Sequence, residues 1–95
     1  MKHTDWLKNK LKDDNFAAQY LTQAVQDLEP AVFIAALRHV VDARGGLAKV
    51  ADVGSLSKAS LYKAIPHSGQ GNPTAKTMFA ALRASGLNLT FSAAS

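Results

Sequence analysis

The sequence contains no cysteine, and no acidic residue occurs after Asp52. The lack of cysteine excludes a disulfide framework, a cysteine nucleophile and a zinc site built on thiolates. No apolar run approaches the roughly 20 residues that a membrane-spanning helix needs. The N-terminus carries several lysines and lacks the apolar core of a signal peptide, so we expect a cytoplasmic protein.

The charged residues are distributed unevenly along the chain. Residues 1–52 carry seven basic and seven acidic side chains, whereas residues 53–95 carry four basic side chains and no acidic one. The formal net charge of +4 therefore lies entirely in the second half. A long stretch without acid is expected where a surface approaches a polyanion such as nucleic acid, and the alternative is a chance excess of lysine.

The remaining composition, with 47% hydrophobic and 19% charged residues, is that of a globular domain and not of a disordered or fibrous chain. A chain of 95 residues has a thin core, so we expect a partner subunit to supply further burial. The predicted organisation is a leader helix over 1–14, one domain over 15–92 and a short tail over 93–95.

Apolar residues recur at helical spacing and are interrupted by proline and glycine, which predicts an all-α fold. The predicted buried faces include Val25 and Leu28 in the second helix and Phe79 in the last helix. The expected helices span residues 5–12, 16–28, 31–44, 47–53, 58–65 and 74–84.

Two terminal segments are candidates for binding a protein partner. The first helix is short and amphipathic, and alternating residues over 87–92 predict one strand with no obvious partner within the chain. Either feature can dock on another protein, and packing on their own domain is the alternative. The residues concerned are Trp6, Leu7 and Leu11 on the helix and Leu87, Leu89 and Phe91 on the strand.

The most informative segment is 47–65, where two short helices joined by a tight turn have the spacing of a helix-turn-helix. Ala51 supplies the small residue that a close helix crossing needs, and Leu61 and Ile65 are expected to pack the second helix onto the first. A second helix with short polar and basic residues on its outer face suits insertion into the major groove. The outward-facing residues are Ser57, Lys58, Ala59, Ser60, Tyr62 and Lys63.

Most of the chain resembles the HigA-type antitoxin family, also described as addiction-module antidote proteins or prophage-type transcriptional regulators. The leading DWLKNKLKD (5–13) also fits the start of such proteins. The segments that carry the resemblance are FAAQYLTQAVQD (16–27), PAVFIAALRHVVDARGGLAKVA (30–51), LSKASLYKAI (56–65), GNPT (71–74) and MFAALRASGLNL (78–89).

The resemblance implies a five-helix, lambda-repressor-like domain behind the leading helix, binding a palindromic operator as a homodimer without a cofactor. It also implies a bacterial, nucleoid-associated protein that represses its own operon and neutralises a RelE/ParE-like toxin. The second helix of the 47–65 segment corresponds to the recognition helix of the family. Gly71, Asn72 and Thr74 fall in a loop near the DNA backbone, and Lys76 follows on the same side.

Three positions depart from the family pattern. The turn position usually held by glycine is Ser55, with Gly54 one place early. Ala59 replaces an acidic residue that is common near the start of the recognition helix. The loop before GNP is longer than expected.

Several alternatives remain open on the residues themselves. Lys58 and Lys63 could be solvated side chains, and Tyr62 could be an aromatic residue at the edge of the core. A stand-alone prophage-type repressor and an interaction module that does not bind DNA are the competing functions. We expect no enzyme and no metal site, because the three histidines lack ligand spacing and no nucleophile motif is present.

Overall fold

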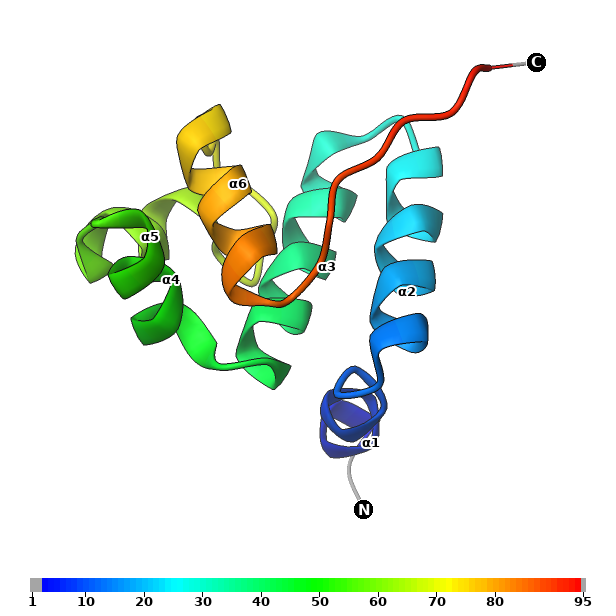
Figure 1. Cartoon of the computed structure of the whole chain (residues 1–95), viewed down its shortest axis with the longest axis horizontal. Helices are drawn as coiled ribbons and strands as arrows, with labels where there is room; N and C mark the ends of the chain where they lie inside the picture. The colour runs from blue at the N-terminus through cyan, green and yellow to red at the C-terminus, as the bar shows by residue number, and fades with distance from the viewer. Residues whose placement is uncertain (1–2, 95) are drawn as a thin grey trace.

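The computed structural model describes residues 3–94 of the chain, with side chains from residue 5 onward. This part of the chain is entirely helical in its regular structure, which confirms the predicted all-α class, and the predicted helix limits agree with the observed ones within two residues. The helices, drawn in Figure 1, are α1 (His3–Lys10), α2 (Asp14–Gln26), α3 (Pro30–Ala43), α4 (Gly46–Gly54), α5 (Lys58–Ala64) and α6 (Ala75–Ala84).

Local sequence signals explain where several helices begin. The Asp13 side chain accepts a hydrogen bond of 2.8 Å from the Phe16 amide and so caps α2. Pro30 is the first residue of α3, a position where its missing N–H costs nothing. Each device satisfies or removes an amide that the first turn of a helix would leave unpaired.

Helix α3 lies at the centre of the molecule, between α2 on one side and α6 on the other (Figure 1). Helices α4 and α5 lie beyond α6, and α1 packs against α3. The largest fully buried side chains come from four of the six helical regions, those of α1, α3, α4 and α5, and they belong to one continuous core. They are Leu11, Leu37, Val40, Val41, Val50, Leu61 and Ile65.

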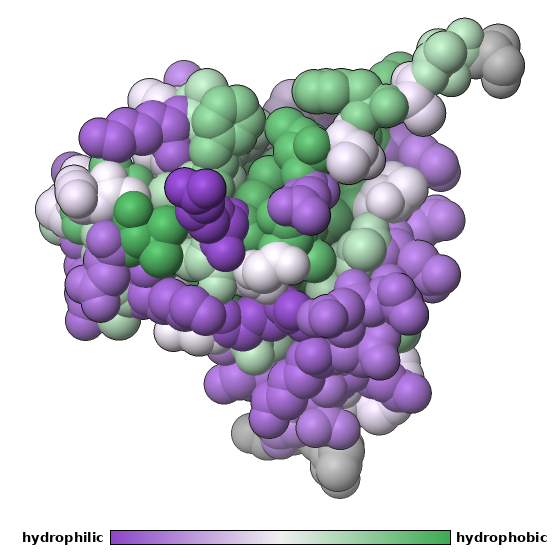
Figure 2. Space-filling model, viewed as in Figure 1, coloured by the Kyte–Doolittle hydropathy of each residue, from purple (hydrophilic) through white to green (hydrophobic). Residues whose placement is uncertain are grey.

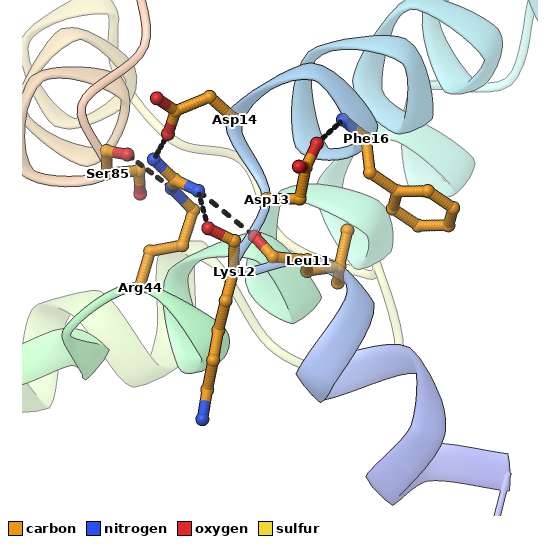
Figure 3. A network of polar contacts seen from close by, with 7 residues as sticks. All are labelled: Leu11, Lys12, Asp13, Asp14, Phe16, Arg44 and Ser85. Atoms are coloured by element: carbon orange, nitrogen blue, oxygen red, sulfur yellow. Dashed lines mark hydrogen bonds and ion pairs between the residues drawn. The ribbon is translucent and has the colours of Figure 1, made fainter.

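Arg44 joins four parts of the fold at the end of α3 (Figure 3). Its guanidinium donates to the backbone carbonyls of Leu11 (3.1 Å), Lys12 (3.0 Å) and Ser85 (2.6 Å), and it pairs with the Asp14 carboxylate. The five N–H donors of an arginine allow one side chain to serve all of these acceptors. Arg44 therefore fastens the α1–α2 turn, the start of α2 and the end of α6 to α3.

Three residues predicted to be buried are exposed. Val25 is 60% exposed, Leu28 95% and Phe79 58%. Helix α2 meets α3 through Ala17, Leu21 and Ala24, so Val25 lies to one side of this stripe. Leu28 lies beyond the end of α2, which stops at Gln26.

The strand predicted over 87–92 is not formed. Residues 87–94 have no regular secondary structure, and residues 3–94 contain no strand with which this segment could pair. The segment runs along the outside of α3 toward the α2–α3 connection (Figure 1). The apolar surface in Figure 2 is concentrated over this segment and the middle of the same face, whereas the surface near α1 is hydrophilic.

Candidate nucleic-acid interface

The turn between α4 and α5 contains a residue with a left-handed backbone. Ser55 has φ 53° and ψ 48°, and it is the single residue other than glycine with a positive φ in the described part of the chain. The Leu56 amide donates to the Ala51 carbonyl at 2.9 Å, which closes the turn. A residue with a Cβ in the left-handed conformation costs about 1 kcal/mol relative to glycine. Ser55 therefore occupies a position at which glycine would be less strained.

Gly54 has a different role from the one its position next to the turn suggests. It is the last residue of α4, and a Cβ placed on it would lie 2.7 Å from the Cβ of Ala80 in α6. Such a distance is far inside van der Waals contact. Gly54 therefore allows α4 and α6 to pack closely, while the neighbouring serine makes the turn.

Helix α5 presents the predicted outer face to solvent and the predicted inner face to the core. Leu61 is 1% exposed and Ile65 is fully buried. These two side chains hold the short helix against the rest of the domain. The exposed residues are Ser57, Lys58, Ala59, Ser60, Tyr62 and Lys63.

The two serines at the start of α5 make different hydrogen bonds. Ser57 Oγ accepts from the Ser60 amide at 3.1 Å, as an N-cap, and its hydroxyl donates to Ser60 Oγ at 2.8 Å. The Ser57 hydroxyl is thereby used within the helix. Ser60 accepts this bond and keeps its own hydrogen for an external acceptor.

Tyr62 is partly covered by a buried arginine from α3. The Arg38 guanidinium carbon lies 5.2 Å from the centroid of the Tyr62 ring, within the range of a cation–π contact. Arg38 is 7% exposed, whereas Tyr62 is 56% exposed. One face of the ring therefore rests on the domain, and the remainder is open to solvent.

Arg38 belongs to a polar cluster that the sequence analysis did not anticipate. Its Nε donates to Asp42 Oδ1 at 3.0 Å, and the other carboxylate oxygen of Asp42 lies 2.6 Å from His67 Nε2. The i, i+4 spacing of Arg38 and Asp42 is a signal that the sequence contains. The histidine comes from the loop after α5, and nothing in the sequence relates it to α3.

His39 lies beside this cluster. Its Nδ1 is 2.9 Å from the Tyr20 hydroxyl, and its ring centroid is 6.3 Å from that of His67. The pKa of His39 is lowered, first by burial and then by His67 and Arg38, against an opposing effect of Asp42. Burial also raises the pKa of Tyr20.

Among residues 5–94 no group of three or more side chains is arranged to hold a metal ion.

The loop after α5 lies against the end of that helix. A Cβ on Gly71 would lie 2.1 Å from the Ala64 carbonyl oxygen, so this contact requires glycine. Thr74 caps α6 by accepting from the Thr77 amide at 3.1 Å, and its hydroxyl donates to Thr77 Oγ1 at 3.1 Å. Gly71 and Thr74 thus have structural roles, whereas Asn72 and Lys76 have exposed side chains without such a role.

The residues considered for partner binding are not equivalent. Leu11 is fully buried in the core, so its side chain cannot contact a partner in this fold. Trp6 is 45% exposed and packs edge-on against Phe16, with ring centroids 6.3 Å apart. Leu7 and Leu87 are half-buried, and Leu89 and Phe91 are 52% and 91% exposed.

Comparison with protein families gives one match, described as "Probable addiction module antidote protein", over residues 2–93. The chain belongs to this family. The match covers nearly the whole sequence and confirms the resemblance drawn from it. Comparisons with curated proteins and with solved structures gave no significant match.

Membership assigns the chain to the antidotes of toxin–antidote modules, so a toxin of some kind is implied as a partner. An antidote is a regulatory protein, and the family description names no catalytic activity. No helix within residues 3–94 is long and apolar enough to cross a membrane.

Proposed function

We propose that this antidote is a sequence-specific, double-stranded DNA-binding repressor of its own operon, and that it also neutralises a RelE/ParE-like toxin. The observation that carries the DNA-binding part is the α4–α5 unit. Its second helix is held by Leu61 and Ile65 and turns every polar and basic side chain outward.

The electrostatics support the same assignment. The three lysines of the α5–α6 region, Lys58, Lys63 and Lys76, are exposed. No acidic residue occurs anywhere in residues 53–95 to offset them. In this proposal the lysines and Asn72 hold phosphates and set the register, while Ser60, Ala59 and Tyr62 contact base edges.

The proposed complex is a homodimer on a palindromic operator in the bacterial cytoplasm, at the nucleoid. Two α5 helices would enter successive major grooves about 34 Å apart, one turn of the DNA helix. The fold would then be of the lambda-repressor-like type, with α1 as the leading helix. Repression would follow because the dimer covers the promoter.

The test is a gel-shift titration on the DNA upstream of the gene, repeated over a range of salt concentrations. Lys63→Ala and Lys58→Ala should weaken binding to all sequences and each lower the salt slope by about one. Lys8→Ala on α1 is the matched control and should leave the slope unchanged. Absence of any shift, or unchanged slopes for both α5 variants, would refute the proposal.

A further inference from the structure

We propose that the toxin docks through a basic segment with an apolar face into a groove between α2 and α3. This inference rests on the antidote function and is independent of DNA binding. It is carried by the shape of the groove, by the acidic residues at one end of it and by the exposed Val32 in its lining.

The groove runs between two packed helices and is open to solvent. It has a volume of about 480 Å³. Three alanines in its floor leave room for larger side chains from a partner, and Gln23 and His39 also line it. The lining residues that matter for the argument are Tyr20, Ala24, Asp27, Val32, Ala35 and Ala36.

The end of the groove near the α2–α3 connection is acidic. Residues 13–37, which include all of α2 and the first half of α3, contain four acidic residues and no lysine or arginine. Asp14 is paired with Arg44, whereas Asp13, Asp27 and Glu29 are exposed and form no ion pair within the described residues. Asp27 lines the groove itself. A basic partner would be attracted to this surface, and an acidic one repelled.

Exposed apolar side chains accompany these acids. Val32, at the start of α3, lines the groove and is 41% exposed, and Leu28, in the α2–α3 connection, is 95% exposed. An exposed group of apolar residues edged by charge is typical of a protein–protein contact. The surface of the partner that complements the groove therefore carries apolar side chains flanked by lysine or arginine.

A second copy of this chain does not match the groove as well. Its exposed apolar segment, residues 87–94, contains no charged residue and would leave Asp27 and Glu29 without partners. Its exposed basic residues on α5 and α6 belong to the surface that the proposed function assigns to DNA. Lys8, Lys10 and Lys12 are exposed as well, but the leucines beside them face their own core, since Leu11 is fully buried and Leu7 is half-buried. The toxin is therefore the occupant that we infer.

The position of the groove permits both partners to bind at once. In Figure 1, α2 and α5 lie on opposite sides of the molecule, with α3 and α6 between them. A toxin seated between α2 and α3 would leave α5 accessible to an operator. The antidote could thus hold its toxin and its DNA in one complex.

The experiment uses the full chain and a synthetic amphipathic peptide of leucine and lysine, followed by amide NMR shifts. We expect the shifts to map to α2 and the first half of α3. The matching peptide of leucine and glutamate should bind at least about tenfold more weakly, because like charges face each other. Binding of the basic peptide should also weaken as salt is raised.

Two matched variants locate the site. Val32→Lys places a positive charge in the groove and should weaken the basic peptide at least about tenfold. Val53→Lys makes the same change at a residue of similar exposure on α4, 43% against 41%, and should leave peptide binding unchanged. Thermal unfolding of both variants verifies that they fold.

Three outcomes would overturn the inference: shifts that map to α5 and α6, equal binding of the two peptides, or no effect of Val32→Lys. Conversion of a dimer to a monomer by Val32→Lys, measured by sedimentation, would instead assign the groove to a second copy and also overturn it. Operator binding of Val32→Lys is measured in parallel. It should equal that of the wild type, so failure of the groove and failure of DNA binding are distinguished.

Discussion

Arg38 Nη1 donates a hydrogen bond of 3.0 Å to the backbone carbonyl of Ile65, the residue at which α5 ends. The same guanidinium pairs with Asp42 and lies under the Tyr62 ring. A single buried side chain of α3 therefore holds both the end of the proposed recognition helix and its aromatic residue. The orientation of α5 depends on α3 as well as on its apolar contacts.

Replacement of Arg38 by alanine should lower the free energy of unfolding by about 3 kcal/mol, because Asp42 and the Ile65 carbonyl would lose a partly buried donor. Arg38→Lys keeps the charge but not the several donors, so it should recover part of the loss. Urea unfolding measures both effects. Arg83→Ala, at an exposed arginine of α6, is the control. An Arg38→Ala protein as stable as this control would contradict the assignment.

The stability of the fold should depend on pH through His39. Its folded-state pKa lies below the ordinary value of 6.5, so the folded chain binds fewer protons than the unfolded chain in this range. The contribution of neutral His39 to the free energy of unfolding is fully present above about pH 6.5, and it is lost as the pH falls toward the folded-state pKa of His39. Melting temperatures between about pH 5 and 8 should therefore decrease on the acid side.

His39→Gln should flatten this acid-side decrease. The comparison is best made in a His67→Asn background, because the contact of His67 with Asp42 is then absent from both proteins, while burial, the largest cause of the lowered pKa of His39, remains. An identical pH dependence with and without His39 would show that the imidazole does not cause the effect.

The turn before α5 offers a pair of neighbouring substitutions with opposite effects. Ser55→Gly should stabilise the protein by up to about 1 kcal/mol, because glycine adopts the left-handed backbone without strain. Gly54→Ala should destabilise it by about 1–3 kcal/mol, because the added Cβ would overlap Ala80. Chemical denaturation of the two variants provides the measurement. Equal effects of the same sign would disagree with the geometry of this turn.

The two serines of α5 should separate stability from DNA binding. Ser57→Ala removes the helix cap and should cost about 1 kcal/mol of stability. Ser60→Ala keeps the cap, because the Ser60 amide still donates to Ser57 Oγ. It should alter the operator preference with little change in melting temperature. Gel shifts on operators with single base-pair changes measure the operator preference, and thermal unfolding measures the stability. A loss of stability in Ser60→Ala but not in Ser57→Ala would contradict these roles of the two serines.

The sequence by itself determined the helices, their caps and the inner and outer faces of α5. These features depend on residues a few positions apart, such as the Ser57 cap and the spacing of Leu61 and Ile65. It also determined the family, since the matching segments extend over nearly the whole chain.

Only the tertiary structure decided which apolar residues meet a neighbouring helix. Leu11 enters the core, whereas Leu28 and Phe91 remain exposed, although all three are equally apolar in the sequence. The structure also brought His67 to Asp42 across 25 residues of chain. Burial and ion pairing of this kind depend on how helices distant in the sequence pack together, and no local spacing encodes that packing.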